Sequence, residues 1–398
     1  MFRFFLYTCM PTAALLAAGC RPPVSACPSR PSENPWCSLA HGIARQIPAD
    51  LHDVERNRAL SDTAITALDL GAHKQAAAIA YDISGWRRGD LLARLGHRCH
   101  ATGRGDAGDR FLKAAENVAR DTGLDSWQRS RIQLAIERAR ASRTATQRSE
   151  AARVTRLDTA DQAALLPDLM QHTVATSNLL DTLNRLETVS RQTLDLDLAA
   201  GAFDAYRVVY QKAGKAGQTS LYRDRLTAGL TLLLNSLHPA IACDKLMEMS
   251  EAAWRLGDTP FAEQMRREID NRLGQIRADM RLPVQTRYAR LLARVGDTRQ
   301  ARHCLAAAET LLPDPAITPA ERAAAHAELG AAWMELGDAA AADGQFADAI
   351  LVVKTLTNSR PRSVAAVRVC LTFARTGIAE PARLSEMADL QNRLGDPW

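Results

Sequence analysis

Glycines that recur at a nearly constant interval constrain this chain more than any other feature of its sequence. Each follows a run of residues that favours helix, and five of the seven are followed, five residues later, by a small alanine. The spacing is close to 40 residues in the second half of the chain, and one long interval of 111 residues equals about three such units. A repeat of this length is typical of stacked helical hairpins. The sequence therefore predicts an all-α fold, a single α-solenoid, with turns at Gly71, Gly103, Gly214, Gly257, Gly296, Gly337 and Gly377.

The unit around Gly337 is the most complete of these predicted hairpins. Apolar residues recur at three- and four-residue spacing on both sides of the glycine, which indicates two amphipathic helices that share a buried face. Gly337 stands where the first helix must end and a left-handed residue is needed. The small residues Gly330 and Ala342 would let the two helices approach closely, with Trp333 and Phe346 filling the remaining space.

This pattern of small and aromatic residues resembles the tetratricopeptide repeat, and the resemblance extends over most of residues 38–398. The interval here exceeds the roughly 34 residues of that family, so longer helices or loops are expected. Between residues 125 and 200 the turn glycine is missing, and we expect degenerate hairpins there. Residues 38–47 and 382–394 are expected to form terminal helices that cap the two ends of the solenoid.

A binding groove follows from the same resemblance. In the tetratricopeptide family, residues of the first helix of each hairpin line the concave surface. Offsets from the turn glycines imply a partner-binding groove lined by Asp90, His97, His100, Asp204, Gln211, Met247, Glu251, Trp254, Arg290 and Met334. Trp254 and Met247 are the side chain types that often anchor a protein partner. The alternative is that Trp254 packs against a neighbouring hairpin.

The first twenty residues have the features of an export signal. A single charge at Arg3 precedes a short apolar stretch, well below the roughly 20 residues that span a membrane. The small residues that end this stretch stand directly before Cys20, and together they resemble the signal of a bacterial lipoprotein. The resemblance implies that residues 1–19 are removed, that Cys20 is lipidated and that residues 20–37 form a proline-rich spacer. It further implies a protein anchored in the outer membrane and facing the periplasm. An ordinary secretory signal and a cytosolic protein with a misplaced start are the alternatives.

The cysteines beyond the signal fall into two groups. Cys27 and Cys37 lie in or beside the proline-rich spacer, and in an oxidising compartment they could pair and close a small loop. Two free thiols are the alternative. The remaining cysteines are far apart in the sequence and occupy apolar helix positions, where we expect small buried side chains. They are Cys99, Cys243, Cys304 and Cys370.

Charge and motifs argue against catalysis and against nucleic-acid binding. The net charge is only +5, and residues of both signs are interspersed. The sequence lacks the usual phosphate-loop, zinc-protease and serine-hydrolase motifs. His97 and His100 could hold an ion from one helix face, but a full site needs three or four ligands. We therefore expect no enzyme activity, metal, cofactor or small-molecule substrate.

Taken together, these features predict a lipid-anchored periplasmic scaffold that binds other proteins. Its layout is similar to that of lipoproteins that help to assemble outer-membrane proteins or pilus secretins, which makes envelope or secretion-complex assembly the expected setting. Two alternatives stay open. One is a structural envelope protein that self-associates by stacking its solenoids, and the other is a metal protein or enzyme centred on His97 and His100.

Overall fold

The computed structural model describes residues 33–141, 183–184, 186–188, 196–378, 380–395 and 398, and within them it contains α-helices and no strand. The first group of helices is α1 (Pro35–Gln46), α2 (Ala49–Asp69), α3 (His73–Tyr81), α4 (Gly85–Ala101), α5 (Gly105–Ala119) and α6 (Ser126–Ala141). The next are α10 (Leu196–Lys215), α11 (Thr219–Ser236), α12 (Pro239–Arg255), α13 (Thr259–Leu273) and α14 (Ala278–Arg294). The last are α15 (Thr298–Glu309), α16 (Pro319–Glu335), α17 (Ala339–Thr355), α18 (Ser359–Thr376) and α19 (Pro381–Asn392). The predicted all-α repeat fold is confirmed.

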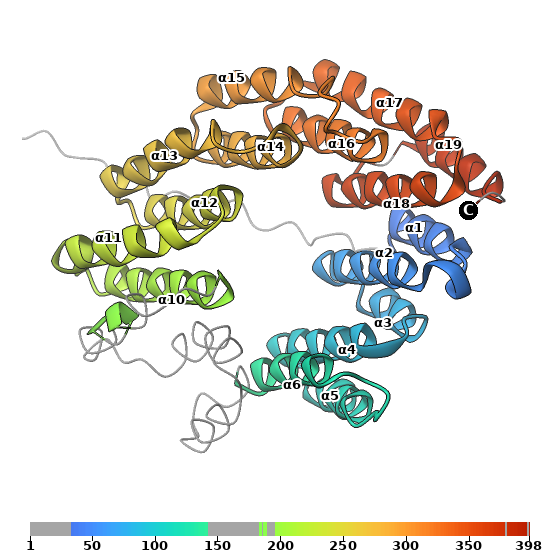
Figure 1. Ribbon diagram of the computed structural model, residues 1–398, viewed down its shortest axis with the longest axis horizontal. Coiled ribbons are helices and arrows are strands. Elements are labelled where there is room, and N and C mark those ends of the chain that lie inside the picture. The colour runs from blue at the N-terminus through green and yellow to red at the C-terminus, as the bar shows by residue number, and fades with distance from the viewer. Residues whose placement is uncertain (1–32, 142–182, 185, 189–195, 379, 396–397) are drawn as a thin grey trace, which may run out of the picture.

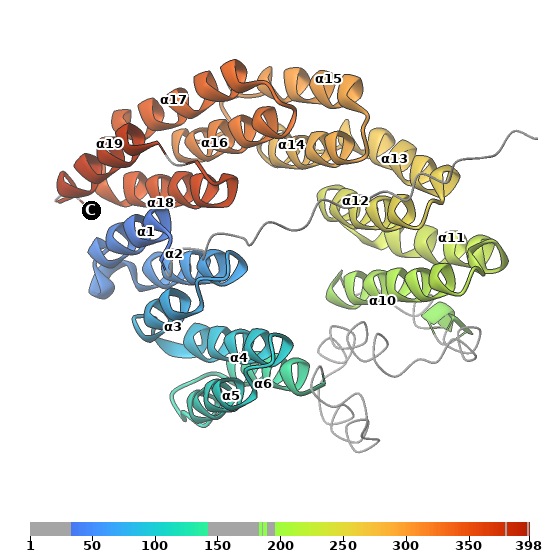
Figure 2. The same cartoon turned by 180° about the vertical axis from the view of Figure 1, so that it is seen from behind.

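These helices form hairpins that stack into a curved, two-layered arc (Figures 1 and 2). Helices α10, α12, α14, α16, α18, α2 and α4 make the inner layer, and each contacts the next in that order. Their partners α11, α13, α15 and α17 lie on the outside. Part of the predicted degenerate region, residues 142–182, lies outside the described residues, whereas α6 packs on α4 and α5. None of the described helices is long and apolar enough to span a bilayer.

Left-handed glycines end the inner helices, as the spacing predicts. Six of the seven predicted turn glycines have φ between 72° and 86°. The exception is Gly214, which lies inside α10, while the left-handed residue is Gly217. Gly214 instead permits close packing, because a Cβ there would lie 2.4 Å from a methyl carbon of Leu256. The prediction of a turn at Gly214 is therefore wrong by three residues.

An aspartate follows three of these glycines and joins neighbouring hairpins. Its side chain accepts a hydrogen bond from a backbone amide in the first turn of the second helix, which caps that helix. The same carboxylate forms an ion pair with an arginine from the second helix of the preceding hairpin. The pairs are Arg223–Asp258 (2.8 Å), Arg266–Asp297 (3.5 Å) and Arg302–Asp338 (2.7 Å). One side chain therefore both ends a turn and fixes the stacking of two repeats.

The helices from the two ends of the chain pack against each other. Helix α1 lies along α18 about as extensively as α15 lies along α14, so it fills the place of a second helix in the last hairpin. Helix α19, which follows α18 in the sequence, packs on α1 instead. Helix α2 continues the inner layer from α18. The expected terminal helices therefore cap one another, and the arc runs without a break through residues from opposite ends of the chain.

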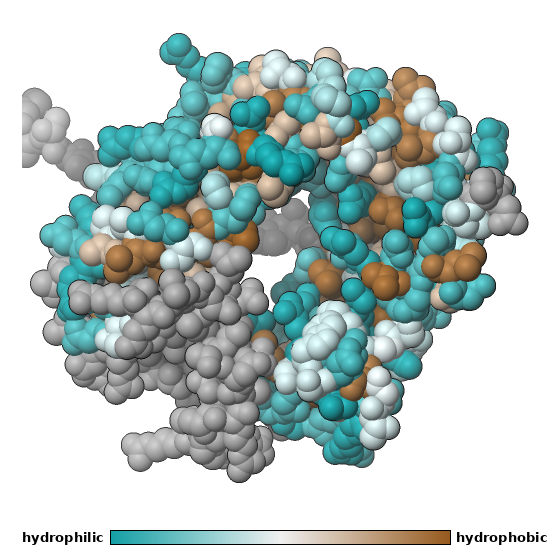
Figure 3. All heavy atoms as spheres, viewed as in Figure 1, coloured by the Kyte–Doolittle hydropathy of each residue, from teal (hydrophilic) through white to brown (hydrophobic). Residues whose placement is uncertain are grey.

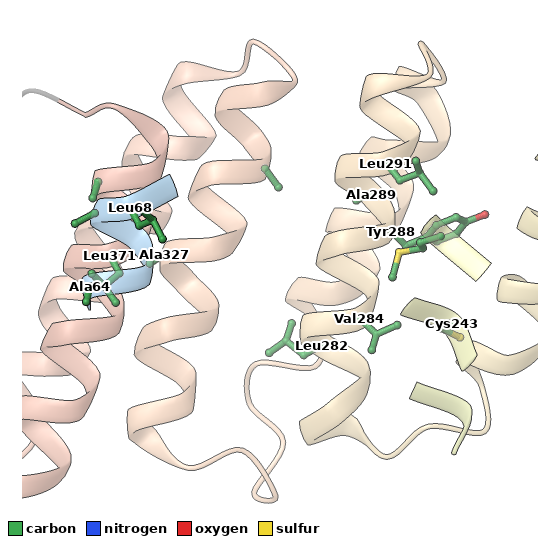
Figure 4. Packing of buried hydrophobic residues seen from close by; sticks show 14 of the residues in the cluster. Ala64, Leu68, Cys243, Leu282, Val284, Tyr288, Ala289, Leu291, Ala327 and Leu371 are labelled. Atoms are coloured by element: carbon green, nitrogen blue, oxygen red, sulfur yellow. The ribbon is translucent and has the colours of Figure 1, made fainter. Parts of the chain in front are cut away.

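Aromatic packing and polar contacts hold this junction together. The Trp36 ring packs edge-to-face on Phe373 at 4.9 Å, and its indole N–H donates to the Ile378 carbonyl at 2.7 Å. The Arg375 guanidinium donates to the Thr66 hydroxyl at 2.9 Å. The buried side chains form one cluster from α1 to α19. Figure 4 shows part of it, with side chains of α2 and α18 lying together.

Candidate functional site on the inner face

The inner face is formed by the sides of the first helices that no second helix covers. On α2, for example, Arg58, Asp62 and Asp69 are exposed at helical spacing, whereas Leu60 and Ala64 are buried. Figure 3 shows a central opening, and where described helices border it the side chains are both hydrophilic and hydrophobic. This surface corresponds to the groove that the sequence predicts.

Ion pairs connect the first helices of the α10–α14 part of the arc. Between α10 and α12, the Lys245 ammonium lies 2.8 Å from the Asp204 carboxylate, and Arg207 lies 3.5 Å from Glu248. Burial raises the pKa of Glu248, and the positive charge of Lys245 opposes that rise.

The same arrangement continues from α12 to α16. Arg287 pairs with Asp244 at 2.8 Å, and Arg294 pairs with Glu251 at 3.6 Å. Arg290 pairs with Glu328 at 3.3 Å and also with Glu335. Because these charges compensate one another across each helix boundary, this half of the inner face has little surplus of either sign.

A sequence register accompanies these ion pairs. From α12 round to α4, the residue nine positions before the turn glycine alternates between acid and base. In the order α12, α14, α16, α18, α2 and α4 it is Glu248, Arg287, Glu328, Arg368, Asp62 and Arg94. The alternation continues across the junction of the chain ends, from α18 to α2. It is a signal in the sequence that favours neighbouring positions for these helices.

Most of the predicted groove residues lie on this inner face. Asp204, Glu251 and Arg290 belong to the ion pairs between helices. Asp90 pairs with Arg94 of its own helix at 3.0 Å. His97 is exposed and Gln211 is half-buried.

Two predicted groove residues lie elsewhere. The Met247 side chain is 8% exposed and belongs to the hydrophobic core. The His100 ring packs over α5, where its Nε2 atom lies 3.3 Å from the Asp109 carboxylate. A Cβ on Gly108 of α5 would be 2.6 Å from that same nitrogen, so the ring occupies space that only glycine leaves free. Neither side chain is placed to anchor a partner.

Trp254 and Met334 are the apolar side chains that remain available on the predicted groove. Trp254 of α12 is 45% exposed and Met334 of α16 is 42% exposed. Each stands three residues before its turn glycine, with α14 between the two helices. The tryptophan is therefore only partly covered by its neighbours. These two positions combine apolar area with a surrounding surface whose charges are already paired.

The described cysteines are free thiols in buried positions. No group of three or more histidine, cysteine, aspartate or glutamate side chains in the described ranges could hold a metal ion. Burial raises the pKa of Cys37 to about 11 and that of Cys243 to about 12, so both thiols are protonated near neutral pH. Cys20 and Cys27 lie outside the described residues, and with them the predicted lipidation site and one half of the predicted disulfide.

Comparisons with known proteins include a distant structural likeness. No protein-family model matches the chain, and no curated protein matches it. Among solved structures the chain is similar to a circular tandem repeat protein described as having a novel repeat topology and enhanced subunit contact surfaces. The identity is 14%, the TM-score is 0.34, and the match covers 90% of this chain and 91% of that one. At this TM-score the likeness supports no inference about function.

Proposed function

We propose that this helical-repeat protein is a scaffold that binds a segment of a partner protein along its inner face, in the manner of a tetratricopeptide-repeat protein. The observation that carries the proposal is the exposure of Trp254 and Met334 on two repeats of that face that are separated by the α14–α15 repeat. Methionine and tryptophan supply large contact areas, and tryptophan is enriched among residues that dominate protein interfaces. The lipoprotein-like signal ending at Cys20 supports our further proposal that the scaffold is anchored in the outer membrane and faces the periplasm, with envelope or secretion-complex assembly as its setting.

Ion pairing on the inner face suggests how such a partner would be held. Charges that already compensate one another between α10 and α16 contribute little net attraction for a ligand. Apolar contacts then provide the affinity, and the paired charges define the border of the contact. A helix or extended segment that reaches from α12 to α16 would meet both Trp254 and Met334.

Replacing Trp254 with alanine should weaken partner binding by about tenfold, because an interface tryptophan commonly contributes more than about 1 kcal/mol. The measurement is the apparent affinity of a partner recovered by cross-linking from the cell envelope. Leu351→Ala is the matched control, because Leu351 is 57% exposed on the outer helix α17. Equal binding by wild type and both folded variants would refute the inner-face assignment.

The anchor is tested separately by Cys20→Ala in a Gram-negative host. We expect the wild-type chain to gain the mass of a diacylglyceryl group and to sediment with membranes, and we expect the variant to lose both properties. Intact-mass analysis and membrane fractionation measure these outcomes. An unmodified, soluble wild-type chain would refute the lipoprotein proposal and leave the scaffold proposal without a membrane location.

The rival proposal of self-association by end-to-end stacking receives no support from the junction. Stacking through the N- or C-terminal helices would need a free repeat face there. Here α1 and α2 cover α18, and α19 packs on α1, so the helices at the chain ends are already occupied. Light scattering over a range of protein concentrations separates the two proposals, because only the stacking protein grows in mass as concentration rises.

A further inference from the structure

Where the two ends of the chain meet, the inner face gathers arginines from three helices. Partial desolvation by the neighbouring helices raises the pKa of the Asp62 carboxyl, and four nearby guanidinium groups oppose that rise. They belong to Arg58 of α2, Arg87 of α4, and Arg368 and Arg375 of α18. Residues from both ends of the chain therefore surround a single carboxylate.

The position of these arginines follows from the packing of the inner helices. Asp62 and Arg368 occupy the same register, nine residues before the turn glycines of adjacent helices α2 and α18. The hydrogen bond between Arg375 and Thr66 fixes the two helices side by side. Helix α2 has α18 on one side and α4 on the other. Asp62 of α2 is exposed and interacts with arginines of both neighbours, so it lies on the inner face.

Three of these arginines lack the compensation found elsewhere on the inner face. Arg58, Arg87 and Arg368 make no ion pair within 4.0 Å among the described residues, although Arg87 lies over the Trp86 ring at 4.7 Å. Arg375 makes a long ion pair with Glu328, at 3.9 Å. Asp62 and Glu328 are thus the acids closest to these four arginines, and Glu328 is shared with Arg290. From α10 to α16, by contrast, bases and acids pair directly between neighbouring helices.

We propose that this basic surface, formed by Arg58, Arg87, Arg368 and Arg375, binds an acidic segment of a partner protein. The inference rests on the proposed function, since it assigns a chemistry to part of the same inner face. Guanidinium groups form paired hydrogen bonds with carboxylates, and their charge speeds the encounter with an acidic partner.

The size and borders of the basic surface favour a short acidic segment over a nucleic acid. Asp69 of α2 and Asp90 of α4 lie on the same inner face beside the arginines. Their carboxylates would repel a long, evenly charged phosphate backbone. A protein segment can place two or three carboxylates opposite the arginines and uncharged residues opposite the aspartates.

The test is fluorescence anisotropy with a labelled peptide of alternating glutamate and glycine, using the full chain. The wild-type protein should bind this peptide at low salt and more weakly as salt rises. The double variant Arg58→Ala/Arg368→Ala should bind about tenfold more weakly, because each exposed charge contact contributes a few-fold. The matched control is Arg267→Ala/Arg299→Ala, which removes two exposed arginines from the outer helices α13 and α15.

Each remaining outcome has a definite meaning when circular dichroism shows that the variants are folded. If the control variant loses as much affinity for the peptide as the double variant does, the inner-face arginines are not the specific binding site, and the proposal is overturned. Tighter binding of a single-stranded DNA oligonucleotide, lost in the same double variant, would replace the protein partner with a nucleic acid.

Failure of the proposed function is a separate result. If the partner depends on Trp254 while the acidic peptide does not bind, the scaffold proposal stands and the basic surface fails. If the peptide depends on Arg58 and Arg368 while partner capture ignores Trp254, the basic surface stands and the Trp254 placement fails.

Discussion

Replacing Trp36 with alanine is expected to lower the free energy of unfolding by about 3–5 kcal/mol, the usual range for removing a large buried aromatic side chain. Trp36 is 2% exposed and lies in the junction between α1 and α18. Its loss removes the edge-to-face contact with Phe373 and leaves the Ile378 carbonyl without its indole donor. Urea denaturation followed by circular dichroism measures the change.

Trp127→Ala is the matched control for this measurement. Trp127 is 55% exposed on α6 and contacts Trp86 at a ring distance of 5.4 Å. Its replacement should cost less than about 1 kcal/mol, because most of that ring already faces solvent. A similar loss in the two variants would contradict a special role for the junction.

Buried thiols provide a local readout of the same change. Cys37 of α1 and Cys370 of α18 are both fully buried at the junction, and Cys243 and Cys304 are buried in the α12–α15 repeats. If Trp36→Ala opens the junction, a maleimide should label the first two faster while labelling of the other two changes little. Uniformly faster labelling of all four would instead indicate global destabilisation.

The sequence was sufficient to predict the local repeat. Turn glycines, apolar spacing and the aromatic of the second helix are set within one hairpin, where neighbours in sequence are also neighbours in space. Gly330 and Phe346 illustrate this, since they meet across the α16–α17 hairpin as their offsets from Gly337 predict. Gly214 has the spacing of a turn glycine, but its missing side chain instead admits Leu256.

The junction could not be predicted from repeat spacing alone. A hydrogen bond such as that between Trp36 and Ile378 joins residues 342 positions apart, and a period describes only how consecutive units follow one another. The alternating charges contain part of this information, because Arg368 and Asp62 continue the series across the junction. The alternation of charge does not by itself identify which helices are neighbours, and it can be recognised as a series only once their order around the arc is known.

The candidate site was predicted unevenly for a physical reason that His100 makes clear. His100, Trp254 and Met334 share one register, three residues before a turn glycine. Five residues after that glycine, the hairpin of His100 has Gly108, whereas the other two have alanine. The missing Cβ lets the histidine ring fold over α5, whereas Trp254 and Met334 remain exposed. The position of a residue relative to the turn glycine therefore predicts where its side chain points only when the residue opposite, on the second helix, is also considered.

Alanine substitutions at two glycines of the α16–α17 hairpin should change stability in opposite directions. At Gly330 a Cβ would lie 2.5 Å from ring carbons of Phe346, and that ring is held in turn by Phe373 at 5.1 Å. Overpacking at such a site should lower the free energy of unfolding by about 2–3 kcal/mol, which exceeds the gain in helix propensity.

Gly344 is the matched position on the exposed face of α17. A Cβ there meets no atom within 4 Å. Gly344→Ala should therefore raise the free energy of unfolding by about 0.5–1 kcal/mol, because alanine lowers the backbone entropy of the unfolded chain. Urea denaturation of both variants gives the comparison. Stabilisation by both alanines would show that Phe346 can move aside, and that the close approach of α16 and α17 does not depend on the absence of a side chain at Gly330.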